Sequence, residues 1–148
     1  VDAAFGRADV VVASAAVADF RPARPHTDKQ HKDDADLVIE LERTTDILAE
    51  LGRRKEGRVL IGFAAETTEV LASARRKLEA KSLDLVVAND VSDPALGFGS
   101  DDNRVWFVDQ AGETELPVMS KRALARLLWD RVAGSARDAA ERRKGRGR

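Results

Sequence analysis

Short apolar runs rich in β-branched residues alternate with amphipathic segments along this chain, and this alternation limits its fold more than any other feature. Such runs are typical of strands buried on both faces, which occur in parallel sheets that helices cover. The alternation therefore predicts an α/β fold, a Rossmann-like three-layer α/β/α sandwich with a mostly parallel sheet. The runs expected to form strands are residues 9–13, 37–42, 59–63 and 83–88.

A β-hairpin is expected as an addition to this sheet. Residues 105–108 and 115–118 are separated by an Ala111-Gly112 turn, a pattern typical of two antiparallel strands. Trp106 on this hairpin is expected either to pack in the core or to anchor a subunit interface. We expect one domain over residues 1–136, incomplete at its amino terminus, followed by a basic disordered tail over residues 137–148.

The composition argues against several kinds of partner. Lys and Arg total 25 and Asp and Glu total 26, so the net charge of −1 predicts binding neither to nucleic acid nor to a membrane surface. The chain contains no cysteine, which removes disulfides, thiolate metal sites and a cysteine nucleophile. No apolar run approaches the ~20 residues that span a bilayer. These features are compatible with a cytoplasmic protein.

Polar residues appear abruptly where three of the expected strands end. In open parallel sheets, ligands bind beyond the carboxyl ends of the strands. Each of the three segments contains an acidic residue, and their small side chains would let a ligand approach the backbone amides. We therefore expect them to line one crevice, although ordinary turn residues would give a similar pattern. The segments are residues 14–19, 64–67 and 89–90.

Four lysines form a second group of candidate binding residues. Lys77 and Lys81 are four residues apart on an expected helix, so their ammonium groups lie on one face. Lys29 and Lys32 belong to a long loop and would close over the same anion. A triphosphate would suit these cations, with Mg²⁺ held by Asp19. The alternative is a solvated surface, where lysine is common.

Motifs of other enzyme classes are incomplete. Gly97-Phe98-Gly99 lacks the third glycine of a dinucleotide-binding fingerprint, because Asp102 stands in its place. A nicotinamide-dependent Rossmann oxidoreductase is therefore kept as an alternative only. A third possibility is a non-catalytic module that dimerises through the hairpin.

Several segments, in their order and spacing, resemble bacterial phosphopantothenate–cysteine ligases. The resemblance extends from about residue 9 to residue 133. Five matching segments in the right order are more specific than any one of them alone. They are residues 15–20, the pair Lys29 and Lys32, residues 62–67, residues 88–91 and residues 97–103.

This resemblance implies an enzyme of coenzyme A biosynthesis. Members of the family use CTP to activate the carboxylate of 4'-phosphopantothenate as an acyl-cytidylate, and the amine of cysteine then attacks to give 4'-phosphopantothenoylcysteine. The implied cofactor is Mg²⁺ bound with CTP. In bacteria this unit is usually joined to an FMN-dependent decarboxylase, and the implied assembly is a homodimer or a larger oligomer through that half.

The resemblance also assigns roles to particular residues. Lys29 is implied to bind the triphosphate and assist catalysis, residues 45–48 to recognise CTP through their backbone, and Phe63 to contact CTP. The family's amino-terminal Gly-rich segment has no counterpart here, so this chain alone is expected to lack activity. The implied binding residues are Ala15, Asp19, Lys29, Thr45, Asp46, Ile47, Leu48, Phe63, Lys77 and Lys81, with Asn89, Asp90 and Lys32 in addition.

Overall fold

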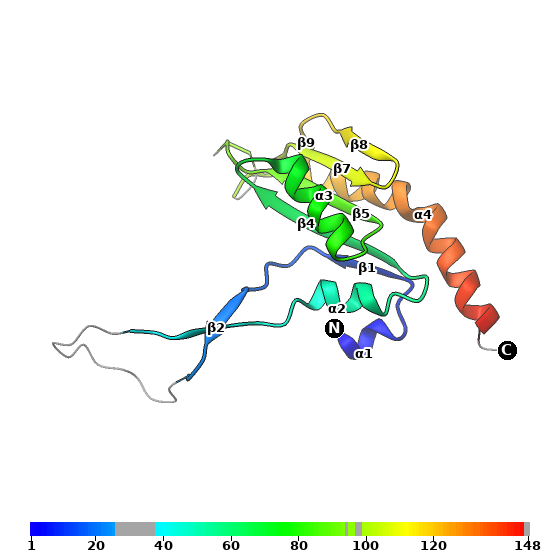
Figure 1. Ribbon diagram of the computed structural model, residues 1–148. Coiled ribbons are helices and arrows are strands. Elements are labelled where there is room, and N and C mark those ends of the chain that lie inside the picture. The colour runs from blue at the N-terminus through cyan, green and yellow to red at the C-terminus, as the bar shows by residue number, and fades with distance from the viewer. Residues whose placement is uncertain (26–37, 94, 97–98, 147–148) are drawn as a thin grey trace.

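A central sheet lies between helices on both of its faces (Figure 1). The computed structural model describes residues 1–25, 38–93, 95–96 and 99–146, with the side chains of Asp2 and residues 142–146 left out. Within these residues the main sheet has five strands in the order β1-β4-β5-β7-β8. They are β1 (Val10–Ala13), β4 (Val59–Glu66), β5 (Leu85–Asp90), β7 (Val105–Asp109) and β8 (Gly112–Glu115).

The first three strands of this order are parallel, and a hairpin completes the sheet, although its second strand is Gly112–Glu115 rather than the predicted residues 115–118. β1 pairs with β4 and β4 with β5 in parallel, whereas β7 pairs antiparallel with both β5 and β8. Parallel neighbours need a crossover, which α3 (Val70–Ala80) provides between β4 and β5. Trp106 on β7 packs against the core beneath α3, so it does not stand free as an interface anchor.

Helices cover both faces of β4 and β5, which explains why these strands are apolar until their polar carboxyl ends. On one face Leu60 packs in a cluster with residues of α3 and of α2 (Ile47–Arg53). On the other face Ile61 packs with residues of α4 (Lys121–Arg146). The two clusters lie on opposite sides of the sheet because side chains alternate along a strand. The predicted three-layer α/β/α sandwich with its hairpin is thus confirmed.

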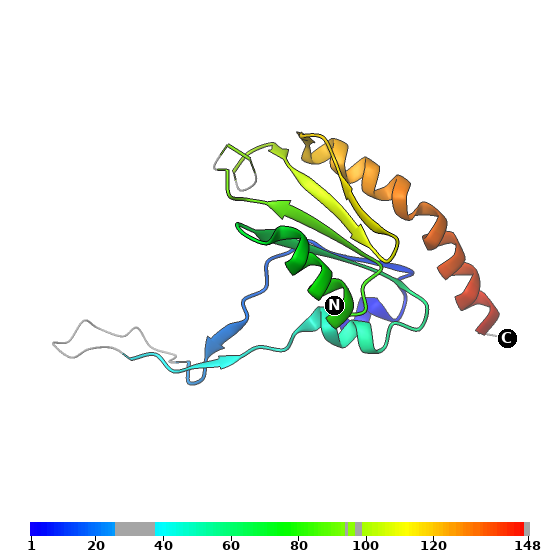
Figure 2. The same cartoon turned by 45° about the horizontal axis from the view of Figure 1, so that its top comes forward.

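Two strands form a separate ribbon that stands away from the sheet in both views (Figures 1 and 2). β2 (Phe20–Pro22) pairs antiparallel with β3 (Leu41–Arg43). The prediction of a sheet strand over residues 37–42 is therefore wrong for the described residues 38–42. Only Leu41 and Glu42 of these form a strand, in the ribbon and not in the sheet, and Leu41 is 58% exposed. Glu40 and Glu42 alternate there with apolar residues, a pattern that suits a strand with one polar face.

The carboxyl-terminal segment is helical where a disordered tail was expected. α4 begins after Ser120, whose hydroxyl accepts a hydrogen bond from the Ala123 N–H at 3.2 Å, and it continues to Arg146. The expectation of disorder is therefore wrong over residues 137–146. Ala139 is fully buried in the cluster beneath α4, and alanine has the highest helix propensity. Burial and propensity together extend the helix into this basic segment.

Three short elements complete the described part of the chain. They are α1 (Asp2–Phe5), β6 (Asp102–Asn103) and β9 (Met119–Ser120), and β6 pairs antiparallel with β9 just before α4. In the ranges described, none of the helices combines the length and the apolar character needed to cross a membrane.

Candidate functional site

The carboxyl ends of the parallel strands bring two of the three polar segments side by side. Ala65 is in register with Asn89, and Glu66 with Asp90. The N–H of Val91 donates to the carbonyl oxygen of Glu66 at 3.0 Å, which joins the ends of β4 and β5. The third segment, residues 14–19, follows β1 at the same edge and leads into the ribbon. Residues 64–66 and 89–90 thus form the carboxyl ends of β4 and β5 rather than loops after them, and the structure places these two segments side by side.

Lys81 joins the end of α3 to the start of α2. Its ammonium group lies 2.9 Å from a carboxylate oxygen of Asp46. Asp46 is also the N-cap of α2 and accepts a hydrogen bond from the Ala49 N–H at 3.0 Å. Partial burial raises the pKa of Asp46, but the Ala49 N–H and the Lys81 ammonium outweigh it and hold the pKa below its usual value.

Lys77 is held by a second carboxylate one turn earlier on α3. Its ammonium donates to Glu66, the last residue of β4, at 2.8 Å. The hydroxyl of Ser73 donates to the same carboxylate oxygen at 2.7 Å. The hydrogen bond from Lys77 is the main cause of the lowered pKa of Glu66, and the bond from Ser73 adds to it.

The two lysines therefore do not form a solvated pair. Nor do they form an unpaired cationic site, because each ammonium group already contacts a carboxylate. Their side chains are 36% and 26% exposed for Lys77 and Lys81, and each has its own carboxylate partner. The carboxylates remove the repulsion expected between like charges four residues apart on a helix. A phosphate group binding here would have to share these ammonium groups with Glu66 and Asp46.

Asp19 lies on the same side of the molecule as the start of α2. The N–H of Thr44 donates to the Asp19 carbonyl oxygen at 2.9 Å, and the Thr44 hydroxyl donates to the Ala18 carbonyl oxygen at 2.6 Å. Asp46 follows Thr44 by two residues, a path of at most about 7 Å. The backbone of Asp19 is therefore close to that of Thr45 and Asp46, and Lys81 contacts Asp46.

Leu48 and Phe63 belong to opposite faces of the sheet. Leu48 packs against the α2–α3 core. The side chain of Phe63 packs against the α4 cluster, and the sheet separates it from Lys77 and Lys81. The structure therefore does not gather all the predicted site residues on one face. Ala15 and Ile47 are exposed.

Asparagine and aspartate side chains close the end of β5. Asp90 accepts hydrogen bonds from the N–H and the hydroxyl of Ser92 at 2.9 and 2.6 Å, and these bonds lower its pKa. The buried Oδ1 atoms of Asn89 and Asn103 have no hydrogen-bond partner in the described structure. Asn103 belongs to the matching segment 97–103 but was not predicted as a site residue. Ser73 was not predicted either, although it lies one turn from Lys77.

The other predicted site features are Lys29, Lys32 and a magnesium site at Asp19. Lys29 and Lys32 lie outside the described residues. Among the side chains that are described, no group of three or more His, Asp or Glu is placed to hold a metal ion. A single carboxylate such as Asp19 still suits Mg²⁺, because this ion usually binds through one or two carboxylates together with substrate phosphates.

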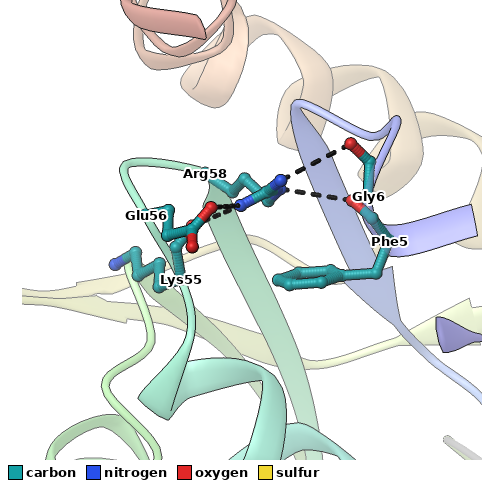
Figure 3. Close-up of polar contacts among 5 residues, drawn as sticks. All are labelled: Phe5, Gly6, Lys55, Glu56 and Arg58. Carbon is teal, nitrogen blue, oxygen red and sulfur yellow. Dashed lines mark hydrogen bonds and ion pairs between the residues drawn. The ribbon is translucent and has the colours of Figure 1, made fainter. Parts of the chain in front are cut away.

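A small pocket of about 210 Å³ lies at the amino end of β4, away from this edge. Figure 3 shows the polar contacts of Arg58 beside it. Arg58 precedes the strand and stacks on the ring of Phe5 at 4.6 Å. Its guanidinium donates to the carbonyl oxygens of Phe5, Gly6 and Lys55 and to the Glu56 carboxylate. These contacts attach α1 to the sheet, so we interpret the pocket as structural.

Comparison with known proteins identifies the family. The model of the DNA/pantothenate metabolism flavoprotein C-terminal domain matches residues 1–135. The chain belongs to this family. Membership of the flavoprotein C-terminal domain family confirms the resemblance found in the sequence.

Relatives and a solved structure agree with this family. The chain is 43% identical over 139 residues to the coenzyme A biosynthesis bifunctional protein CoaBC of Bacillus subtilis, covering 93% of this chain and 34% of that protein. It is 41% identical over 128 residues to the protein of the same name from Thermococcus kodakarensis, and the match covers 84% of this chain and 30% of that protein. The crystal structure of a CoaBC C-terminal domain superposes with a TM-score of 0.72 at 37% identity, covering 93% and 59%. The chain spans about a third of the length of the curated relatives.

Proposed function

We propose that this chain is the nucleotide-binding core of a CTP-dependent ligase that joins 4'-phosphopantothenate to L-cysteine in coenzyme A biosynthesis. The observation that carries this proposal is the pairing of Lys77 with Glu66 and of Lys81 with Asp46 beside the carboxyl edge. Similarity to proteins named for coenzyme A biosynthesis supports the choice of reaction.

The chemistry requires two anions to approach each other. The substrate carboxylate attacks the α-phosphorus of CTP, the bond to pyrophosphate breaks, and an acyl-cytidylate forms. The cysteine amine then attacks the acyl carbon, loses a proton and releases CMP. Lys77 and Lys81 would bind phosphate oxygens and neutralise charge that develops on the leaving group. The exposed backbone around Ala15 and residues 45–48 would hold the nucleotide.

Asp19 would hold Mg²⁺ together with the nucleotide phosphates, and the metal would neutralise part of their charge when bound. Lys29 would bind the triphosphate and assist turnover of the acyl-cytidylate. A closed loop around this intermediate would exclude water and so protect it from hydrolysis. The relatives are named as bifunctional proteins, and the proposal includes an FMN-dependent decarboxylase elsewhere in the longer, cytoplasmic protein.

A homodimer is part of the proposal, with the ribbon rather than the 105–118 hairpin as its interface. The ribbon exposes the apolar side chains of Phe20 and Leu41, and Ile39 is exposed just before β3. Within the ribbon, Arg21 pairs with Glu42 at 2.7 Å. A two-stranded ribbon is marginally stable alone in water, so an apolar cover would stabilise it. Arg21 and Glu42 pair with each other, and Arg43 stacks on the Phe20 ring at 5.6 Å. The matching surface of a second copy, which carries the same apolar side chains and arginine, therefore suits the ribbon better than a uniformly charged partner.

The experiment is a titration of the full-length protein with CTP, ATP and NADH in the presence of Mg²⁺. We expect CTP to bind in preference to ATP. Pyrophosphate should be released once phosphopantothenate is added, and CMP only after cysteine is added as well. Binding of NADH instead would favour the oxidoreductase. Absence of binding to all three nucleotides would favour a non-catalytic module.

A further inference from the structure

The carboxylate of Glu66 connects the end of β4 to two successive turns of α3. One oxygen, Oε1, accepts hydrogen bonds from the Ser73 hydroxyl at 2.7 Å and from the Lys77 ammonium at 2.8 Å. The side chain of Glu66 is 26% exposed. No role follows for Glu66 from the resemblance to the ligase family, yet Lys77 is its direct partner.

Glu66 is itself well anchored. It ends β4, whose preceding residues are largely buried, and its carbonyl oxygen accepts the N–H of Val91 from the segment after β5. The bond from Ser73 fixes the carboxylate against α3. A lysine side chain has many rotamers and three hydrogen-bond donors. A fixed acceptor therefore restricts Lys77 while using only one of its three donors.

Lys81 has a comparable but separate anchor. Its partner Asp46 is fixed as the N-cap of α2 and lies beside the Asp19 segment. Glu66 instead holds Lys77 toward the ends of β4 and β5. The two carboxylates thus hold the two lysines of one helix face at different places along the carboxyl edge. Lys77 lies at the ends of β4 and β5, and Lys81 at the start of α2.

We propose that Glu66 is a positioning residue that orients Lys77 toward the phosphates of the bound nucleotide. The inference rests on the proposed function and deepens it. Glu66 lowers the entropy that Lys77 loses when it binds a phosphate, because the side chain is already restricted in the free protein. Glu66 therefore affects the affinity for the nucleotide, and it does so only through Lys77.

Two other roles would give different results on mutation. If Glu66 mainly neutralised Lys77, removing its charge would strengthen nucleotide binding. If the ion pair only stabilised α3, substitutions would lower the melting temperature without a specific effect on CTP. Glu66→Gln keeps an acceptor oxygen for Lys77 and Ser73 but has no charge, whereas Glu66→Ala removes the acceptor. The pair of variants therefore separates orientation from charge.

The test measures the Kd of Mg²⁺–CTP and the KM and kcat of the full-length protein. We expect Glu66→Ala to weaken CTP binding by about three- to tenfold, the range for freeing one rotamer-rich side chain, and Glu66→Gln to stay within about twofold of the wild type. In a Lys77→Met background, Glu66→Ala should have no further effect on the Kd. If Glu66→Ala does not fold, Ser73→Ala serves as a milder substitute. It should weaken CTP binding by about twofold.

Several outcomes would overturn the inference. Unchanged or tighter CTP binding by Glu66→Ala would do so, as would equal weakening by Glu66→Ala and Glu66→Gln. An effect of Glu66→Ala that persists in the Lys77→Met background would show that Glu66 does not act through Lys77. If the wild type bound CTP, these results would count against the role of Glu66 alone. A wild type that binds no CTP would contradict the proposed function and this inference together.

Discussion

Lys81, the C-cap of α3, forms an ion pair at 2.9 Å with Asp46, the N-cap of α2. Each charge lies at the helix end that it complements, because the amino end of a helix carries partial positive charge and the carboxyl end partial negative charge. One ion pair therefore places a complementary charge at the ends of two helices. It also holds the start of α2, beside the Asp19 segment, against the end of α3.

The capping role of Asp46 is separable from its charge. Asp46→Ala removes both the acceptor for Ala49 and the partner of Lys81, and we expect a loss of about 1 kcal/mol in the free energy of unfolding. Asp46→Asn keeps the cap, and because the ion pair is half-exposed we expect only ~0.2–0.5 kcal/mol. Urea unfolding of the two variants checks this. Equal losses would show that the ion pair, not the cap, is the main contribution.

Gly52 allows α2 to approach the end of α3. A Cβ atom at this position would overlap the carbonyl oxygen of Lys81. Because backbone atoms cannot move aside like the end of a side chain, we expect Gly52→Ala to lose about 1–3 kcal/mol of unfolding free energy. Gly134→Ala is the matched control: nothing lies within 4 Å of its Cβ position on α4. The control should gain roughly 0.5–1 kcal/mol from helix propensity.

Acid should weaken the contact between the hairpin turn and α4. Burial raises the pKa of Asp109, but Arg131 at 2.6 Å and the N–H groups of Ala111 and Gly112 lower it further, so the net pKa is below its usual value. The unfolded chain therefore binds this proton at higher pH than the folded protein does. The contribution to stability is present above the unfolded pKa and is lost as the pH falls through the folded pKa.

The variant Asp109→Asn tests this pH dependence. It keeps an acceptor for the turn but loses the ion pair with Arg131. The stability difference from the wild type should be largest at neutral pH and should shrink as the pH falls below about 4, the ordinary aspartate range. Guanidinium unfolding at several pH values measures it. A difference that stays constant down to pH 2 would contradict the assignment.

Phosphate binding by α3 predicts a specific effect of its lysines. Lys81→Met should weaken CTP binding by about tenfold, comparable to the loss of one charge-assisted hydrogen bond. Arg76→Met is the control on the same helix, since the Arg76 side chain is 66% exposed and faces Glu69. The control should change the Kd by less than twofold in calorimetry. Equal effects would indicate a general electrostatic attraction instead of a site.

The ribbon predicts the oligomeric state. Leu41→Asp places a charge on its apolar surface and should shift a dimer toward monomer in sedimentation at micromolar concentration, because burying an unpaired charge is costly. Val118→Asp changes a residue that is also exposed, at 49%, but lies after β8. This control should leave the assembly unchanged. A wild-type monomer at these concentrations would contradict the proposed interface.

Much of the candidate site was accessible from the sequence because strand ends and helix faces follow local patterns. The spacing of Lys77 and Lys81 placed both on one helix face, and the polar residues that end β4 and β5 lie side by side. Glu66 and Asp46 were not recognisable as lysine partners, since each pair joins two elements that only the fold brings together. The side of the sheet that Phe63 occupies also depends on which helix packs there.

The sequence by itself determined the α/β class, the hairpin and the edge where polar residues gather, because periodic burial of apolar side chains is a local property of the chain. Only the tertiary structure decided that residues 41–43 leave the sheet for a ribbon and that α4 extends through residue 146. It also decided which carboxylate neutralises each lysine. These outcomes depend on contacts between segments far apart in the chain, which local patterns do not encode.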